Sequence, residues 1–358
     1  MAKTRSLIIN PGSTSTKIAV FHETEVVFVK TLRHSAEELA QYDTIADQKG
    51  FRKDIIMEAL QDNDIAIDKI DVCVGRGGFL KPIVGGTYEV TDDVYNDLLI
   101  GRTGQHASNL GGVLAREIAD ELGKKAYIVD PVVVDELMPI ARVTGIPEIE
   151  RRSIVHALNH KAVGKRYAES VGREYNELNL IICHLGGGVS VAAHQNGKMI
   201  EVPDALDGDG AFSPERTGRI PVGPLVELCF SGKYTKEEIK KMLVGKGGFV
   251  AHLGTNNMIE VDDRIEAGDE KAKFIMNAFV FQLAKDIGAA ATALYGDVNQ
   301  IIITGGIAYD PYVVEGLKQR CSWIAPITIY PGEDELKALT EGVLRVINGK
   351  EEPMNYNA

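Results

Sequence analysis

The chain has 358 residues, of which 44% are apolar, enough for two hydrophobic cores. Its 51 acidic residues outnumber 39 basic ones, and this net charge of −12 argues against nucleic acids and anionic membranes as partners. The cysteines are scattered, and Cys73 and Cys183 lie in apolar strand-like segments, so we expect reduced core thiols and a cytoplasmic protein. No apolar segment is long enough for a signal peptide or a membrane span.

The first predicted element is a β-hairpin at residues 6–21, SLIINPGSTSTKIAVF. An apolar strand enters a turn rich in Gly and Ser, and an alternating strand returns. We then expect a third strand at 25–32, a helix at 37–60 and a short strand at 70–74 that enters the glycine loop 75–78. Helices at 91–99 and 110–122 and a strand at 126–129 follow. This order predicts a mixed sheet flanked by helices.

The second half starts with a crossing between domains at 142–150 and a helix at 153–171. Residues 178–194, LNLIICHLGGGVSVAAH, then predict a strand, a triple-glycine turn and a return strand. Glycines in such a turn let backbone amides approach a phosphate closely. The segment 204–224 has almost no periodicity, and so long a loop is usually functional.

The remaining elements are mostly helical. We expect helices at 224–231 and 236–243, a glycine loop at 245–248 and an amphipathic helix at 271–295 that backs the sheet. Strands are expected at 298–306 and 327–330, and the last helix, ending near residue 348, should return to the first domain.

The two halves of the chain share a pattern. LIINPGSTSTKIAV aligns with LIICHLGGGVSVAA, and IDVCVGRGG at 70–78 aligns with VNQIIITGG at 298–306. Two related halves, each with a phosphate-type turn, predict a duplicated α/β fold with a nucleotide in the cleft between two domains. We expect one domain at 1–150, completed by 335–358, and a nucleotide-binding domain at 151–334.

Three arginines are candidates for anion binding. Arg76 lies between glycines at the end of a buried strand, and Arg216 and Arg219 lie in the long irregular loop. A guanidinium donates two parallel hydrogen bonds to a carboxylate or phosphate. The alternative for each is an ordinary salt bridge.

Several histidines and carboxylates each have two interpretations. His156 and His160 are one turn apart on the predicted helix, the spacing of a metal pair, but HALNH lacks the Glu of a zinc peptidase helix. Contact with a phosphoryl group is the other interpretation, and it also applies to His106 and His184 beside glycine loops. The acidic residues 333–335 either orient Mg²⁺ through water or form a solvated helix start.

Four motifs together resemble the acetate and butyrate kinase family: NPGSTSTK at 10–17, CHLGGGVS at 183–190, SPERTG at 213–218 and ITGGIAYD at 303–310. They span nearly the whole chain in the family's order. VGRGGFLKP at 74–82 and DPVVVDEL at 130–137 are most similar to its butyrate kinases. The resemblance implies the actin-like (ribonuclease H-like) duplicated fold. It also implies reversible transfer of the γ-phosphoryl group of ATP to a short fatty acid, with Mg²⁺, giving an acyl phosphate and ADP.

The resemblance also implies roles for individual residues. The implied catalytic groups are Arg76, Arg216 and His156, with His106 and Asp130 as further residues of the cleft. The implied ATP-binding residues are Ser13, Ser15, Lys17, His184, Gly186, Gly187, Gly188, Gly305, Gly306 and Ile307. The implied metal-organising residues are Asn10 with Asp334, or next Glu335. Only small-molecule substrates are expected as partners, besides further copies of the chain in a homo-oligomer of at least two.

The chain departs from the acetate kinase pattern at several places. Ala308, Tyr309 and Asp310 replace Gly-Glu-Asn, Arg219 replaces Asp, and the segment after Arg76 is shorter. These changes concern the base contacts and the acid pocket.

Val155 is expected to line the acid pocket, since it precedes His156 where acetate kinases have Phe. The smaller side chain leaves room for two more methylenes, which favours butyrate. The alternative is that Val155 only packs in the core and that the loop 77–82 shapes the pocket.

The predicted chemistry agrees with a carboxylate substrate. A carboxylate nucleophile is already ionised at pH 7, whereas a sugar kinase needs a positioned carboxylate base. Cationic groups that reduce repulsion between acid and phosphoryl group are what this reaction requires. The alternatives are acetate, propionate or a branched acid as substrate, a sugar kinase on the same fold, and a chaperone-like ATPase.

Overall fold

The computed structural model describes residues 3–206 and 208–357, which divide into two compact units. The first unit contains Met1–Val134, Ala157–Ala162 and Asp334–Ala358, and the second contains Asp135–His156 and Val163–Glu333. The first segment of the first unit ends at Val134, and the boundary expected at residue 150 stays a prediction. The division into an acid and phosphate domain and a nucleotide domain stays a prediction.

The first unit is built on a six-stranded mixed sheet in the order β3-β2-β1-β4-β6-β5. The strands are β1 (Arg5–Pro11), β2 (Ser15–His22), β3 (Glu25–Arg33), β4 (Val72–Gly75), β5 (Thr87–Glu89) and β6 (Lys125–Val129). Strands β1, β4 and β6 are parallel, and β2, β3 and β5 pair antiparallel with their neighbours. The predicted hairpin, third strand and two later strands are confirmed. Strand β5 was not predicted, because three residues are too few to show an alternating pattern.

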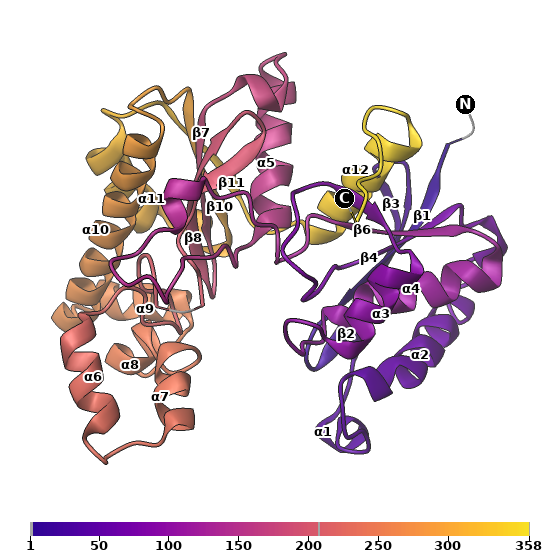
Figure 1. Cartoon of the computed structure of the whole chain (residues 1–358), viewed down its shortest axis with the longest axis horizontal. Coiled ribbons are helices and arrows are strands. Elements are labelled where there is room, and N and C mark those ends of the chain that lie inside the picture. Colours follow the sequence, from indigo (N-terminus) through magenta and orange to yellow (C-terminus); the bar gives the residue numbers. More distant parts are fainter. Residues whose placement is uncertain (1–2, 207, 358) are drawn as a thin grey trace. The chain divides into compact units, whose positions relative to one another are not determined.

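Helices cover both faces of this sheet (Figure 1). They are α2 (Lys49–Gln61), α3 (Asp92–Ile100), α4 (Asn109–Leu122) and α12 (Glu335–Ile347), whereas the one-turn α1 (Ala36–Leu39) buries none of its residues. Leu7 and Ile9 of β1 share a core with α2, α3 and α4, whereas Ile8 between them shares a core with α12. This alternation is the two-residue period of a strand buried on both faces. The yellow C-terminal helix thus packs on the first sheet, as the last helix was expected to do (Figure 1).

The single helix predicted at 37–60 is wrong, because the structure breaks it into α1 and α2. A capping box formed by Ser35 and Glu38 starts α1, which ends after one turn. The backbone N–H and the hydroxyl of Thr44 both donate to the Asp47 carboxylate, at 2.9 and 2.7 Å. Such local side-chain bonds compete with helix continuation.

The second unit repeats the plan on a five-stranded sheet in the order β11-β10-β7-β8-β9. Its strands are β7 (Leu180–Leu185), β8 (Val189–Gln195), β9 (Lys198–Glu201), β10 (Gln300–Gly305) and β11 (Ile327–Pro331). The hairpin β7-β8 corresponds to β1-β2, and β10 lies parallel to β7 as β4 lies parallel to β1. The predicted internal repeat is confirmed by this matching strand order.

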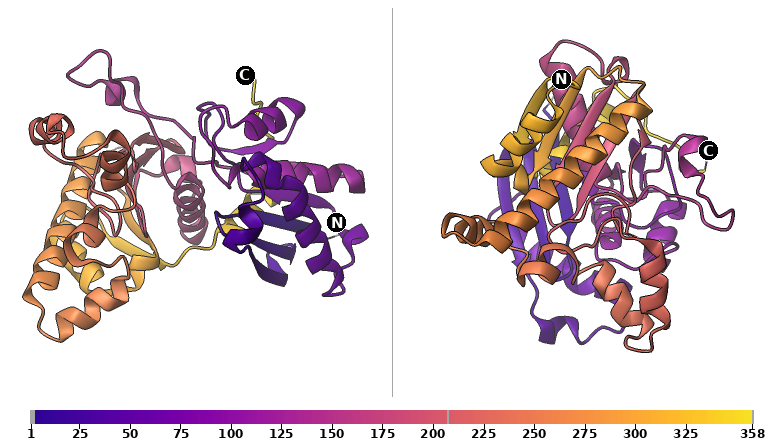
Figure 2. Two further views of the ribbon diagram at one scale, coloured as in Figure 1. Left: turned by 90° about the horizontal axis from the view of Figure 1, so that it is seen from below. Right: turned by 90° about the vertical axis from the view of Figure 1, so that its left-hand side faces the viewer.

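Helices also cover both faces of the second sheet (Figures 1 and 2). They are α5 (Ala157–Ser170), α8 (Gly248–Leu253), α9 (Met258–Glu266), α10 (Glu270–Ala293) and α11 (Pro311–Cys321). Ile181 and Cys183 pack in the core under α10 and α11, and Leu180 and Ile182 pack with Val163 of α5. The helices α6 (Val222–Phe230) and α7 (Lys236–Leu243) contribute no described residue to these core clusters. Of the helices described, none is both long and apolar enough to cross a bilayer.

The predicted helix start at Ser153 is wrong, because α5 begins at Ala157 with His156 as its N-cap residue. The preceding segment has no regular secondary structure, and the carbonyl of Ile154 accepts a hydrogen bond of 3.1 Å from the Ala205 N–H in the long loop. His156 therefore lies on irregular backbone before the helix, while His160 is fully buried within it.

Candidate active site

Three predicted site residues lie at one edge of the first sheet. Asn10 lies near the end of β1, Arg76 follows β4 and Asp130 follows β6. The register pairs Ile9 with Gly75 and Gly75 with Ile128, so these three parallel strands end at the same level. Ligands of open α/β sheets bind at the carboxyl ends of parallel strands.

Glu335 joins two of these residues. Its Oε2 accepts a hydrogen bond of 2.6 Å from Asn10 Nδ2, and its other carboxylate oxygen forms an ion pair with Arg76. Asp334 is instead the exposed N-cap residue of α12, and it accepts from the Lys337 N–H at 3.2 Å. The structure therefore brings Glu335, rather than Asp334, to Asn10.

This cluster has the donor chemistry that Mg²⁺ requires. Mg²⁺ takes oxygen ligands, usually one or two carboxylates together with water and substrate phosphates. Glu335 and Asn10 offer such oxygens at the sheet edge. Within residues 3–206 and 208–357, no three His, Cys, Asp or Glu side chains are grouped to hold a metal. The residues present fit a magnesium ion bound largely through water and phosphate.

The first phosphate turn connects β1 to β2. It is closed by a hydrogen bond of 2.7 Å from the Gly12 N–H to the Ser15 carbonyl, and Ser13 in the turn is exposed. Lys17 is the register partner of Asn10, so their side chains lie on the same face of the sheet. The turn and the start of β2 thus place three predicted residues next to Asn10 at the end of β1: Ser13, Ser15 and Lys17.

Arg76 is fixed by a close approach of two backbones. A Cβ on Gly75 or on Gly111 would overlap with backbone atoms of the facing segment, so β4 can meet α4 only through glycine. His106 lies just before α4, and its Nδ1 is hydrogen-bonded to Ser108 Oγ at 2.9 Å. Partial burial of the ring and the charge of Arg76 lower the pKa of His106. The imidazole is therefore neutral at pH 7.

Asp130 has an unusual backbone conformation, with a φ of 40°. Its N–H donates to the Gly86 carbonyl at 3.0 Å, and its Oδ1 accepts from the Gly86 N–H at 2.7 Å. Its side chain is buried. Non-glycine residues held in the left-handed region often lie at functional sites.

In the second unit, the triple-glycine turn follows β7. The Gly186 N–H donates to the Gly188 carbonyl at 3.0 Å, and Ser213 Oγ donates to the Gly187 carbonyl at 2.7 Å. Ser213 belongs to the long loop predicted at 204–224, which is irregular in its described part; Asp207 lies outside the described residues. The loop and the turn are thereby joined.

Arg216 lies against this turn. A Cβ on Gly188 would overlap with the Arg216 guanidinium, whose Nη1 donates to the Ala205 carbonyl at 3.0 Å. Burial lowers the pKa of Arg216 from its usual value, although the charges of Glu215 and Asp204 oppose this effect. Its Nε is buried and has no hydrogen-bond partner, and within the described part of the chain Arg216 forms no ion pair. A desolvated cation of this kind requires an anion.

Two histidines stack behind the turn. The rings of His156 and His184 are 4.1 Å apart at an angle of 25°. His156 Nδ1 is hydrogen-bonded to Ser190 Oγ at 3.0 Å, and His184 Nε2 lies 3.2 Å from the Glu333 carboxylate. These contacts fix both rings beside the glycine turn.

The predicted adenosine residues follow β10. Gly305 has a φ of +92°, and a Cβ there would overlap with the Leu185 backbone, so only glycine lets β10 end against β7. Gly306 is exposed, whereas the Ile307 side chain is packed in the core. Ile307 can therefore offer only its backbone to a ligand. Val155, just before His156, is 2% exposed.

Similar proteins decide the family. A profile described as the Acetokinase family matches residues 145–321. "Butyrate kinase 2" of Clostridium acetobutylicum is 58% identical over 354 residues, which cover 99% of each chain. "Butyrate kinase 1" of the same organism is 54% identical and covers 98% of this chain and 99% of its own. The chain belongs to the acetokinase family. The resemblance in the motifs is thus confirmed, as is the predicted enzyme class, a phosphotransferase with a carboxyl acceptor.

Solved structures confirm the acetokinase fold. The acetate kinase of Porphyromonas gingivalis is 19% identical with a TM-score of 0.77, and it covers 95% of this chain and 99% of its own. A propionate kinase of Francisella tularensis is 18% identical with a TM-score of 0.76 and the same coverage. These likenesses establish the actin-like two-domain α/β fold that was predicted.

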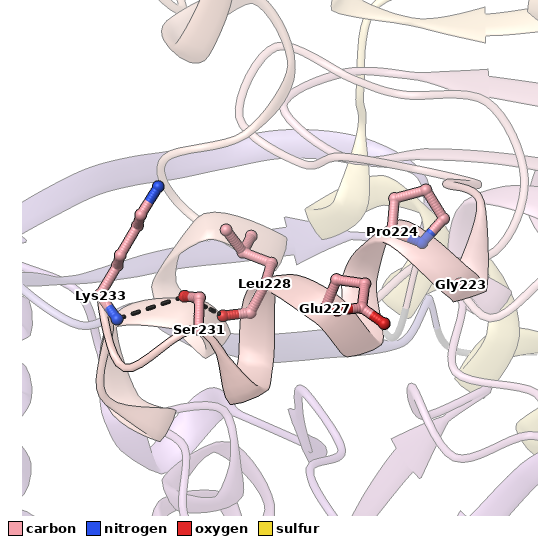
Figure 3. A pocket seen from close by; sticks show the side chains of 6 residues that line it. All are labelled: Gly223, Pro224, Glu227, Leu228, Ser231 and Lys233. Atoms are coloured by element: carbon pink, nitrogen blue, oxygen red, sulfur yellow. Dashed lines mark hydrogen bonds between the residues drawn. The ribbon is translucent and has the colours of Figure 1, made fainter.

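A surface pocket of the chain lies elsewhere, on α6 (Figure 3). Its lining residues are Gly223, Pro224, Glu227, Leu228, Ser231 and Lys233. No predicted site residue of this acetokinase is among them. This pocket is therefore not part of the candidate active site.

One residue that holds the first phosphate turn was not predicted from the sequence. Arg52 of α2 is 1% exposed and bonds to the carbonyls of that turn. The sequence does indicate that Arg52 is buried, because it lies one turn before Ile56 and two turns before Ala59 on the apolar face of the helix.

Proposed function

We propose that the chain transfers the γ-phosphoryl group of ATP reversibly to butyrate, giving butanoyl phosphate and ADP. The observation that carries the proposal is the desolvated Arg216 guanidinium beside the triple-glycine turn, with no ion pair to a described residue. Such a group can bind the negative charge of a phosphoryl group with two parallel hydrogen bonds. The choice of butyrate is supported by the two butyrate kinases of Clostridium acetobutylicum, which are 54% and 58% identical to this chain.

The reaction needs little proton chemistry. A carboxylate oxygen of butyrate attacks the γ-phosphorus and forms a new O–P bond, while the bond from that phosphorus to the β,γ-bridging oxygen breaks and ADP leaves. Butyrate is already ionised at neutral pH, so no base has to remove a proton. The protein has to position the reactants and offset their repulsion.

The second unit would hold the transferred group. The backbone N–H groups of Gly187 and Gly188 and the fork of Arg216 would bind phosphate oxygens. His156 would donate to a phosphoryl oxygen, since Ser190 and the stacked His184 fix its ring. Gly305, Gly306 and the Ile307 backbone would lie beside the adenosine.

The first unit would hold the acid. Among the described residues Arg76 uses Nη1 for Glu335, and its other guanidinium donors would bind the butyrate carboxylate. His106 beside it is neutral and would add no competing charge. Asp130 is a further polar group at the same edge. Asn10 and Glu335 would hold Mg²⁺ through water and phosphate, and the bound ion would neutralise charge on the phosphates. The homo-oligomer stays a prediction.

The test is an assay with ATP, Mg²⁺ and hydroxylamine, which traps acyl phosphate as a hydroxamate. We expect hydroxamate with butyrate and no ATP consumption with glycerol or hexoses. Arg76→Ala and Arg216→Ala should each lower kcat at least about a hundredfold, and Lys in place of either arginine should restore little because the fork is lost. Arg320→Ala, at an exposed arginine of α11, should keep normal turnover. Sugar-dependent ATP consumption, or a folded Arg216→Ala variant with normal kcat, would overturn the proposal.

A further inference from the structure

Arg52 is the largest fully buried side chain of the described residues. Its Nη1 donates to the carbonyls of Gly12 and Ser15 at 2.9 and 3.2 Å, and its Nη2 donates to the carbonyl of Ser13 at 3.2 Å. Gln48 Oε1 accepts from Nε at 3.1 Å and from Nη2 at 2.9 Å. One guanidinium thus holds three carbonyls of the first phosphate turn, those of Gly12, Ser13 and Ser15.

All of these acceptors are neutral. The remaining one is Thr16 Oγ1, at 3.0 Å from Nη1, and across the described residues Arg52 makes no ion pair. Thr16 Oγ1 is also hydrogen-bonded to His34 Nε2 at 2.9 Å. Burial, with the Arg52 charge, lowers the pKa of His34, which is therefore neutral at pH 7. A buried cation without a counter-charge is costly, so its position calls for an explanation.

The geometry of the turn supplies one. In a trans peptide, the C=O and the following N–H point in opposite directions. Because the carbonyls of Gly12 and Ser13 point toward Arg52, the N–H groups of Ser13 and Thr14 point away from it. Ser13 and Thr14 are exposed. Successive N–H groups that point outward from a turn form an anion-binding concavity.

We infer that Arg52 is a positioning residue for the first phosphate turn. It holds the carbonyls inward, so that the amides present a concavity to a phosphate group, and that phosphate supplies the counter-charge that the protein lacks. The ligand is a phosphate of the nucleotide. The inference rests on the proposed function to the extent that a phosphate-bearing substrate must reach this turn.

The test compares ligands with and without phosphates. Binding of ATP and of adenosine is measured by calorimetry for the full chain, for Arg52→Met and for Arg52→Lys. Lys53→Met is the matched control, because Lys53 is the next residue of α2 and pairs with Glu121 away from the turn. Arg52→Met should weaken ATP binding at least about tenfold and leave adenosine binding unchanged. Without Arg52 the backbone amides of the turn are no longer held toward the phosphate, and their charge-assisted hydrogen bonds to it are lost. Lys53→Met should change neither.

Arg52→Lys keeps the charge but loses the planar fork, so it should bind ATP several-fold more weakly with adenosine unaffected. It also decides the question if Arg52→Met does not fold. Equal losses for ATP and adenosine would reduce Arg52 to a structural role and overturn the inference, as would normal ATP binding by Arg52→Lys. The readout involves no acid. If the unmodified chain does not phosphorylate butyrate, but the Arg52 variants bind ATP more weakly and adenosine normally, the proposed function is contradicted and the role of Arg52 stands.

Discussion

Gly188 leaves no room for a side chain beside the guanidinium of Arg216. A Cβ at position 188 would overlap with Arg216 Nη1, Nη2 and the carbon between them. These atoms are the far end of a flexible side chain, so the protein can fold around a methyl group there by moving Arg216. The position of the guanidinium, more than the stability of the unit, depends on this glycine.

Gly188→Ala should therefore lower kcat at least about tenfold, because a shift of about 1 Å in a catalytic group is costly. The matched control is Gly288→Ala in α10, outside the candidate site, where nothing lies within 4 Å of a Cβ. It should keep near-normal kcat. Steady-state kinetics and melting temperatures of both variants give the answer. Equal kcat for the two variants would show that Arg216 is not positioned by this contact.

Glu335 and Asp334 are adjacent carboxylates with different expected roles. Glu335→Gln loses the charge that meets Asn10 and Arg76, so it should raise the Mg²⁺ concentration for half-maximal activity and lower kcat at least about tenfold. Asp334→Asn keeps a side chain that can cap α12, so its activity should stay near normal. Activity is titrated with Mg²⁺ for both variants. The reverse pattern would assign the metal to Asp334.

Asp262 on α9 links stability to pH. Burial, followed by the charges of Asp310, Asp263 and Glu266, raises the pKa of Asp262 from 3.8 to about 6. A carboxyl whose folded pKa is raised binds its proton more tightly in the folded state, so stability is lost as pH rises from about 4 through 6. Asp262→Asn removes this loss. After a discount for solvent screening, it should stabilise the chain by about 1–2 kcal/mol at pH 7.5 and by much less at pH 4.

The control for Asp262 is Asp54→Asn, which makes the same charge change at an exposed residue of α2 that does not contribute to the pKa of Asp262. Denaturant unfolding of both variants at the two pH values measures the effect. A stabilisation by Asp262→Asn that is equal at pH 7.5 and pH 4 would show that the carboxyl is not the cause.

Much of the fold could be predicted because the chain repeats one plan. The hairpins at 6–21 and 178–194 have apolar strands around glycine turns, and their periodicity survives in β1-β2 and β7-β8. The helix boundaries that were predicted wrongly are set by individual hydrogen bonds. Thr44 and Asp47 end a helical pattern through side-chain bonds, and the residues before His156 pair with a distant loop. Neither hydrogen bond changes the hydrophobic periodicity from which helices and strands are predicted.

The candidate site was predicted less completely than the fold. Its glycines and arginines stand out in the sequence, and the structure brings Arg216 to Gly188 and Arg76 to the strand edge of Asn10. The preference for Asp334 over Glu335 could not be decided, because a cap and a ligand look alike among three consecutive acidic residues. Arg52 was missed because arginine on a helix is usually solvated. The predicted roles of the individual site residues stay predictions.

Val155 tests the acid pocket. Its side chain is buried immediately before His156, and its small size should admit a longer acyl chain. Val155→Phe should therefore lower kcat/KM for butyrate far more than for acetate, because the added ring would occupy the space of the extra methylenes. The two values are compared in the hydroxylamine assay. Equal losses for both acids would mean that Val155 only packs in the core and that the pocket lies elsewhere.

The measurement that bears most directly on butyrate as the substrate is kcat/KM across acetate, propionate, butyrate and hexanoate. Each buried methylene contributes about 0.8 kcal/mol, so two of them favour butyrate over acetate by roughly fifteenfold. We expect kcat/KM to rise from acetate to butyrate by about that factor. A kcat/KM for acetate equal to or above that for butyrate, or no hydroxamate with any of the acids, would contradict the assignment.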